Sequence, residues 1–159
     1  MTPIDLVDEL VEFLKKVIKN YDLSTKMNGI SKRPSVYAGY LPTQDEEDDD
    51  ELKTPDDYPC ILVRFIMDQD DINQDDLTSI RLIIGTYSID DQSGWRDTLN
   101  IATRIKTELK KQHVFGPFSL IGTVQTELFE EQLRPYWHGI MDIDFCIPQV
   151  QAELEMEDW

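Results

Sequence analysis

Residues 77–112 constrain the fold most, because they read in turn as a strand, an acidic turn and a helix. Ile80, Leu82 and Ile84 recur at every second position, which is typical of a β-strand with one face against a core. Residues 89–94 are rich in side chains that hydrogen-bond their own backbone, as turns are. The helix that follows has one apolar stripe, which we expect to face the sheet: Trp95, Leu99, Ala102, Ile105 and Leu109.

A second amphipathic helix is expected near the start of the sequence. Thr2 suits the cap position, Pro3 the first helical position and Asp5 the third, which together make a capping box. The helix should end near Asn20. Its expected buried stripe is Ile4, Val7, Leu10, Val11, Leu14, Val17 and Ile18.

Four further stretches have the pattern of β-strands. Residues 36–40 form a short candidate between two prolines. Residues 60–67 (CILVRFIM) are almost continuously apolar, which predicts a buried strand in which Arg64 needs a polar partner. Residues 118–128 and 137–147 alternate apolar and polar side chains, as half-buried strands do.

The order of these elements predicts a single α+β domain over residues 1–148. Its expected architecture is a mostly antiparallel, mixed β-sheet with two helices packed on one face. Residues 43–58 contain the continuous acidic run 45–51, and repulsion between its charges predicts a mobile loop. Residues 149–159 are expected to form an acidic C-terminal tail.

The charge balance restricts the classes of function. The sequence has 15 Lys and Arg against 32 Asp and Glu in 159 residues, a net charge of −17. Such a surface does not hold nucleic acid by its phosphates, but it suits the wall of a passage through which DNA moves without binding. The candidates to face such a passage lie at the tip of the hairpin predicted before residue 77: Asp68, Asp70, Asp71, Asp75 and Asp76.

The sequence shows no strong catalytic or metal-binding pattern. His138 is expected on the same strand face as Asp142 and Asp144, so a divergent metal-dependent hydrolase is one interpretation. Alternating charges on a solvated sheet face explain these residues more simply. The run 45–51 lacks the alternating spacing and the glycine of a calcium loop. We therefore predict no catalytic residue, no bound metal and no cofactor.

Two cysteines and the absence of long apolar runs bear on the cellular context. Cys60 and Cys146 both fall within apolar, strand-like stretches, which predicts two buried, reduced thiols. The sequence shows neither a signal-peptide pattern nor a run of about 18 apolar residues, so we expect neither secretion nor a membrane span.

Three short segments carry a resemblance to a known family: residues 84–87 (IGTY), 94–97 (GWRD) and 135–148 (PYWHGIMDIDFCIP). With the strand at residues 60–67, they resemble the tail-terminator (tail-completion) proteins of long-tailed phages and prophages. The resemblance covers roughly residues 58–148, and its motifs are structural rather than catalytic. The long acidic insertion before it has no counterpart that we can assign in the family.

The resemblance implies a non-enzymatic virion structural protein. Such a protein forms a ring, usually of six subunits, that stops polymerisation of the tail tube and presents the surface that joins the head. The implied partners are other copies of the chain, the tail-tube protein and the head–tail connector proteins, and DNA passes through without specific binding. The implied location is the tail–head junction of the virion, after assembly in the host bacterial cytoplasm.

Subunit contacts in such a ring are expected to use arginine and aromatic residues, which are enriched at interfaces. The candidates are Arg96, Arg134, Tyr136 and Trp137, although Trp137 is equally well interpreted as a core residue. A second interpretation of the whole chain is an acidic adaptor or inhibitor domain that mimics the charge of nucleic acid.

Overall fold

The computed structural model describes residues 2–27, 29–42 and 57–147. The predicted acidic run 45–51 and the predicted tail at 149–159 therefore lie outside the described residues. The elements follow one another along the chain as α1 (Pro3–Val17), β1 (Leu23–Ser24), β2 (Ser31–Lys32), β3 (Ser35–Ala38), β4 (Cys60–Gln69), β5 (Asp76–Tyr87), α2 (Trp95–Lys111), β6 (Val114–Phe115), β7 (Phe118–Leu128) and β8 (Tyr136–Ile147).

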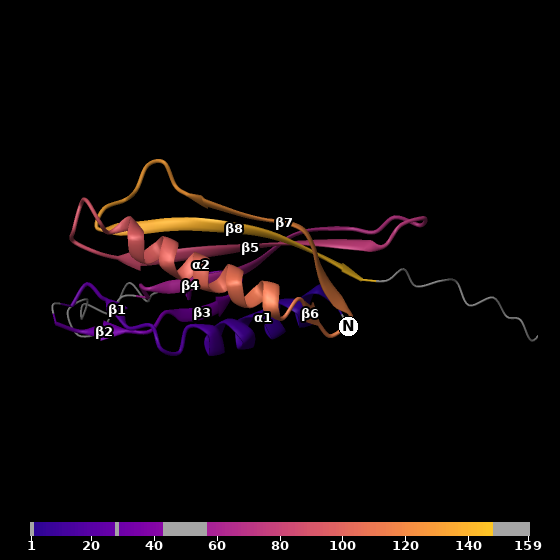
Figure 1. Ribbon diagram of the computed structural model, residues 1–159, viewed down its shortest axis with the longest axis horizontal. Helices are drawn as coiled ribbons and strands as arrows, with labels where there is room; N and C mark the ends of the chain where they lie inside the picture. Colours follow the sequence, from indigo (N-terminus) through magenta and orange to yellow (C-terminus); the bar gives the residue numbers. More distant parts are fainter. Residues whose placement is uncertain (1, 28, 43–56, 148–159) are drawn as a thin grey trace, which may run out of the picture.

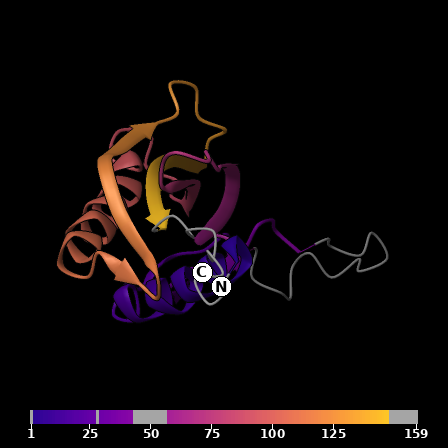
Figure 2. The same ribbon diagram turned by 90° about the vertical axis from the view of Figure 1, so that its right-hand side faces the viewer.

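Six of the strands form one sheet in the order β3-β4-β5-β8-β7-β6 (Figure 1). Strand β3 runs parallel to β4, whereas the other neighbours are antiparallel. Strands β1 and β2 pair separately with each other. Figure 2 shows the curl of the large sheet and the two helices beside it. The predicted α+β class, with a mostly antiparallel mixed sheet and two helices, is confirmed.

The core lies between one face of the sheet and the two helices. The strand register places Val63, Leu82 and Met141 side by side on β4, β5 and β8, and all three side chains are buried. Both helices contribute buried side chains to the same cluster, so they cover the same face of the sheet. Neither of the two described helices covers the opposite face, which carries Arg81 and Asp142.

Helix α2 has the predicted bounds to within one residue, but the predicted phase of its apolar stripe is wrong at the start. Trp95 is 36% exposed and Leu99 is only half-buried, whereas Thr98 and Ile101 are fully buried. Thr98 is tolerated in the core because its hydroxyl is 2.7 Å from that of Thr86, so both are hydrogen-bonded. Threonine counts as polar in the sequence pattern, so the pattern alone puts the buried stripe too far to one side of the helix.

Helix α1 shows a similar mixture of agreement and correction. The capping box is present, and the backbone N–H of Thr2 donates to Asp5 Oδ2 at 2.7 Å. The helix ends at Val17 rather than near Asn20. Ile4 is 71% exposed, whereas Leu6, which the predicted stripe omitted, is fully buried.

Strand β4 is buried only in its first part. Cys60 to Val63 are buried, but Phe65, Ile66 and Met67 are 44%, 47% and 49% exposed, so the prediction of a wholly buried strand is wrong. The reason is that β3 has four residues and its last pair joins Ala38 to Val63. Beyond that point no strand of the described residues pairs with the outer edge of β4. Arg64 finds the partner it needs, because its Nε donates to Gly39 O at 3.1 Å.

Candidate functional site

The β4–β5 hairpin extends past both helices at one end of the long axis (Figure 1). The five carboxylates that the sequence assigned to a passage belong to this hairpin, and all but the half-buried Asp76 are exposed: Asp68, Asp70, Asp71, Asp75 and Asp76. Ile72 lies among them and is 87% exposed. The structure thus brings the predicted acidic residues together, and their position facing a passage stays a prediction.

Two of these carboxylates interact at the base of the tip. The pKa of Asp76 is raised from its usual 3.8 to about 6, first by a hydrogen bond shared with the Asp68 carboxyl, and then by burial and by the negative charges of Asp68 and Asp70. Asp68 also accepts a hydrogen bond from Thr78 Oγ1 at 3.1 Å. Asp76 Oδ1 is buried and has no hydrogen-bond partner in the structure. The charge of the hairpin therefore becomes less negative as the pH falls toward 6 and below.

A groove with basic residues at its rim lies beside the last turn of α1, away from the hairpin tip, and the sequence analysis does not predict it. It is bounded by α1 and the segment that leads into β3, encloses about 540 Å³, and is lined by Lys15, Ile18, Lys32, Arg33, Pro34, Ser35, Val36 and Tyr37. We call this the basic groove. Lys32 Nζ is held by Ser35 Oγ at 3.0 Å and by Asp57 O at 3.3 Å.

A charge signal for the basic groove is present in the sequence. Residues 1–33 contain six of the 15 basic residues and five of the 32 acidic ones, a net charge of +1 in a chain of net −17. The remaining residues carry a net −18. This asymmetry between segments indicates a locally basic surface, but only the structure shows that residues from a helix and from a short strand share one groove.

The three segments of the family resemblance meet at one end of the sheet. Thr86 pairs with Trp137 and Tyr87 with Tyr136 across β5 and β8. Gly94, before α2, lies directly against the Trp137 indole, where any side chain would overlap the ring. The indole Nε1 donates to Ser88 O at 3.1 Å. Packing therefore accounts for Thr86, Gly94 and Trp137 in these motifs.

The candidate interface residues divide into accessible and buried ones. Arg134, whose side chain is 59% exposed, lies over the Trp137 ring with Cζ 5.6 Å from the centroid. Arg96 is exposed and lies over the Trp95 ring at 5.4 Å. Tyr136 is half-buried, with its ring centroid 4.8 Å from that of Tyr58. Trp137 is only 4% exposed, which favours its interpretation as a core residue.

The carboxylates and histidine considered for metal chemistry are engaged in the protein. Asp142 receives two hydrogen bonds from Arg81, at 2.8 and 3.1 Å. Asp144 accepts from Ser79 Oγ at 2.8 Å. His138 Nε2 lies 2.5 Å from the Tyr58 hydroxyl, and burial lowers the pKa of its ring. Over residues 2–27, 29–42 and 57–147, no group of three or more His, Cys, Asp and Glu side chains could hold a metal ion.

Two further observations complete the site. Cys60 is buried as predicted, but Cys146 is only half-buried, so the prediction of two buried cysteines is wrong for Cys146; both are free thiols. Neither described helix combines the length and the apolar character that crossing a lipid bilayer requires.

Comparison of the sequence with protein-family models and with curated proteins finds no match. The resemblance to tail terminators therefore rests on the three segments described above together with the strand at residues 60–67.

Proposed function

We propose that this protein is a non-enzymatic, ring-forming virion structural protein of the tail-terminator type. The observation that carries the proposal is the exposed apolar surface of the projecting hairpin. Phe65, Ile66 and Met67 are three consecutive residues with nearly half of each exposed, and Ile72 at the tip is 87% exposed. The ring form itself comes from the resemblance.

This surface is unusual for a chain that works alone. An open strand edge with apolar side chains is a ready site for association, and monomeric proteins usually block it with charge, proline or a covering element. Here the outer edge of β4 beyond Val63 has no strand partner within the described residues. The hairpin also reaches past the helices, where another molecule can approach it (Figure 1). Self-association buries this surface.

In the proposed ring, the protein caps the tail tube and joins it to the head connector at the tail–head junction. Six copies are expected by analogy with the family. DNA passes through the centre without specific binding, because a strongly acidic chain repels phosphates. Under this proposal the protein needs neither a cofactor nor a catalytic residue.

Sedimentation velocity over a range of protein concentrations, followed by electron microscopy of the particles, tests the proposal. We expect closed rings at high concentration or after addition of the tail-tube protein. Met67→Lys should abolish assembly, because a lysine on an open strand edge opposes strand pairing. Thr123→Lys, at an exposed position of β7, is the matched control and should assemble normally.

A chain that stays monomeric at all concentrations, with and without the tail-tube protein, would refute the ring. A stable monomer that forms a 1:1 complex with some other protein would instead support the acidic adaptor interpretation.

A further inference from the structure

We propose that the tip of the β4–β5 hairpin of one protomer docks into the basic groove of a second copy of the chain. This inference rests on the proposed function and specifies its subunit contact. Ile72 enters the apolar floor of the groove, while the aspartates beside it meet the cations at the rim.

The hairpin tip combines one apolar side chain with surrounding negative charge. Ile72 is 87% exposed and lies between Asp71 and Asn73 in the turn. The Asp71 carboxylate accepts the Asn73 N–H at 2.8 Å, and the Asp71 carbonyl accepts the Gln74 N–H at 3.2 Å, so the turn has a defined shape. An isolated isoleucine presented in this way gains most from a pocket on another molecule.

The basic groove offers the complementary chemistry. Its floor includes Ile18 and Val36, which are 1% and 8% exposed, and its volume of about 540 Å³ is ample for one isoleucine side chain and its neighbours. Lys15, Lys32 and Arg33 stand at the rim.

The cations at the rim are only partly neutralised within the protomer. Lys15 pairs with Glu12 at 3.3 Å. Lys32 binds the backbone carbonyl of Asp57, whereas the Asp57 carboxylate accepts a hydrogen bond from the Tyr37 hydroxyl at 3.2 Å. Arg33 is exposed and makes no ion pair with any other described residue. An acidic partner is therefore favoured at this groove.

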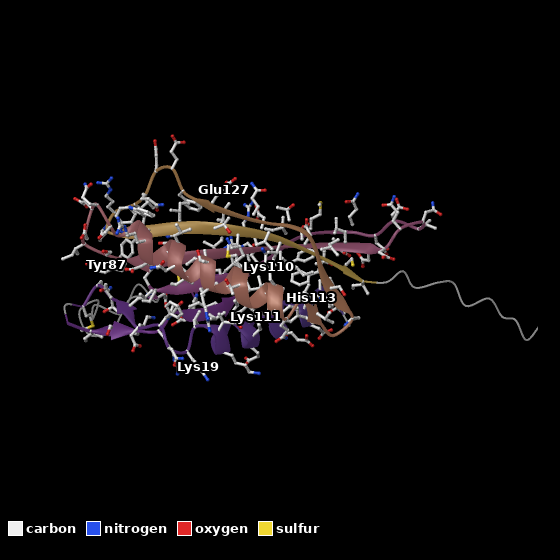
Figure 3. The ribbon with its side chains drawn as sticks, in the orientation of Figure 1. Lys19, Tyr87, Lys110, Lys111, His113 and Glu127 are labelled. Atoms are coloured by element: carbon white, nitrogen blue, oxygen red, sulfur yellow. The ribbon has the colours of Figure 1, made fainter. Side chains whose placement is uncertain are left out.

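The two surfaces lie too far apart to meet within one protomer. In Figure 1 the hairpin tip is at one end of the long axis, whereas β1, β2 and the last turn of α1 lie toward the other end. Figure 3 shows Lys19, four residues after Lys15, on the lower edge of the molecule, far from the hairpin tip and pointing outward. A contact that joins different surfaces of two copies is head-to-tail, and such contacts generate rings when the rotation closes.

This placement is an alternative to the one in which the hairpin carboxylates face the DNA passage, and Ile72 distinguishes the two. A wall that repels phosphates requires the carboxylates only. A docked hairpin requires the isoleucine as well, because its burial supplies the apolar part of the contact.

A charge-swap experiment at about 0.15 M salt tests the contact in the full chain. The first variant, Asp70→Lys with Gln74→Lys and Asp75→Lys, changes the net charge of residues 70–75 from −3 to +2 and so makes the hairpin tip basic. The second, Lys15→Glu with Arg33→Glu, makes the groove acidic. Each variant alone should fail to assemble, since like charges then face each other, whereas an equal mixture should assemble because each mutant surface finds its opposite.

Ile72→Ser should raise the concentration needed for assembly about tenfold or more, as loss of an interface anchor does. Two matched controls should leave assembly unchanged. Lys110→Glu with Lys111→Glu reverses two cations at the end of α2 (Figure 3), and Ile89→Ser removes an isoleucine that is 80% exposed and lies outside both surfaces. All substituted side chains lie at the surface or are partly exposed, so circular dichroism and melting temperature should match the wild type.

The outcomes separate this contact from the proposed function. Wild-type rings together with normal assembly of both charge variants and of Ile72→Ser would overturn the contact and leave the ring. Failure of the mixture as well as of each charge variant would also overturn it, because the two surfaces would then not meet. If the swap pattern holds but the particles are open chains or dimers, the contact stands and the terminator function is overturned.

Discussion

Truncation of Ile101 tests which face of α2 packs on the sheet. Ile101 is 0% exposed and belongs to the core cluster that includes Met141 of β8. Ile101→Ala removes three carbon atoms, which is about 2.4 kcal/mol at roughly 0.8 kcal/mol per buried methylene. The remaining cavity adds to this loss, so we expect the free energy of unfolding to fall by about 3–4 kcal/mol, within the range of about 2–5 kcal/mol for such truncations.

The assay is urea unfolding followed by circular dichroism, with thermal melting as a second measurement. For a chain of this size, about 3 kcal/mol corresponds to a fall in melting temperature of roughly 6–12 °C. Leu99→Ala is the matched control, because it lies two residues away on the same helix and is only half-buried. It should lower the free energy of unfolding by about 1 kcal/mol. A loss for Leu99→Ala equal to or greater than that for Ile101→Ala would refute the helix phase described here.

Three further predictions concern single contacts. Gly94→Ala should lower the free energy of unfolding by about 1–3 kcal/mol and alter tryptophan fluorescence, because the new methyl group overlaps the Trp137 indole; an unchanged or higher melting temperature would show that the ring moves aside freely. Asp76→Asn should raise the melting temperature at pH 7.5 but not at pH 4. Because the pKa of Asp76 is raised in the folded protein, the free energy of unfolding of the wild type falls as the pH rises from 3.8 to about 6. Asparagine binds no proton, so the variant does not lose stability in this way. An equal change in melting temperature at both pH values would contradict this prediction. Arg81→Gln should change the free energy of unfolding by less than about 1 kcal/mol in urea titrations, because the pair with Asp142 is 40% and 41% exposed and solvent screens it; a larger loss would show that the pair is effectively buried.

The parts of the fold that the sequence predicts well are those where local chemistry and tertiary packing agree. The capping box of Thr2 and Asp5 forms as expected, and β8 alternates buried and half-buried residues from Trp137 to Phe145 as its pattern indicates. In both cases the signal lies within one element. Arg64 likewise finds a backbone carbonyl partner, as an arginine in an apolar strand must.

The parts that the sequence does not predict depend on neighbours that are distant in the chain. Thr98 enters the core only because Thr86 of another element satisfies its hydroxyl. Phe65 is exposed because β3 is short, a property of a different strand. The basic groove combines Lys15 of α1 with Lys32 of β2, and no local pattern shows that these two lie together.

The position of β8 in the sheet has a consequence for synthesis. It is the last described strand along the chain, yet it lies in the middle of the sheet, between β5 and β7. Protein chains fold from the N-terminus as they leave the ribosome, and contacts between distant segments form slowly. Strands β3, β4 and β5 can associate with α1 early, but β7 has only the two-residue strand β6 to pair with until residues 136–147 emerge. The β4–β5 hairpin, which we assign to assembly, is therefore synthesised well before the sheet can be completed by β8. During this interval the nascent chain is most exposed to premature association.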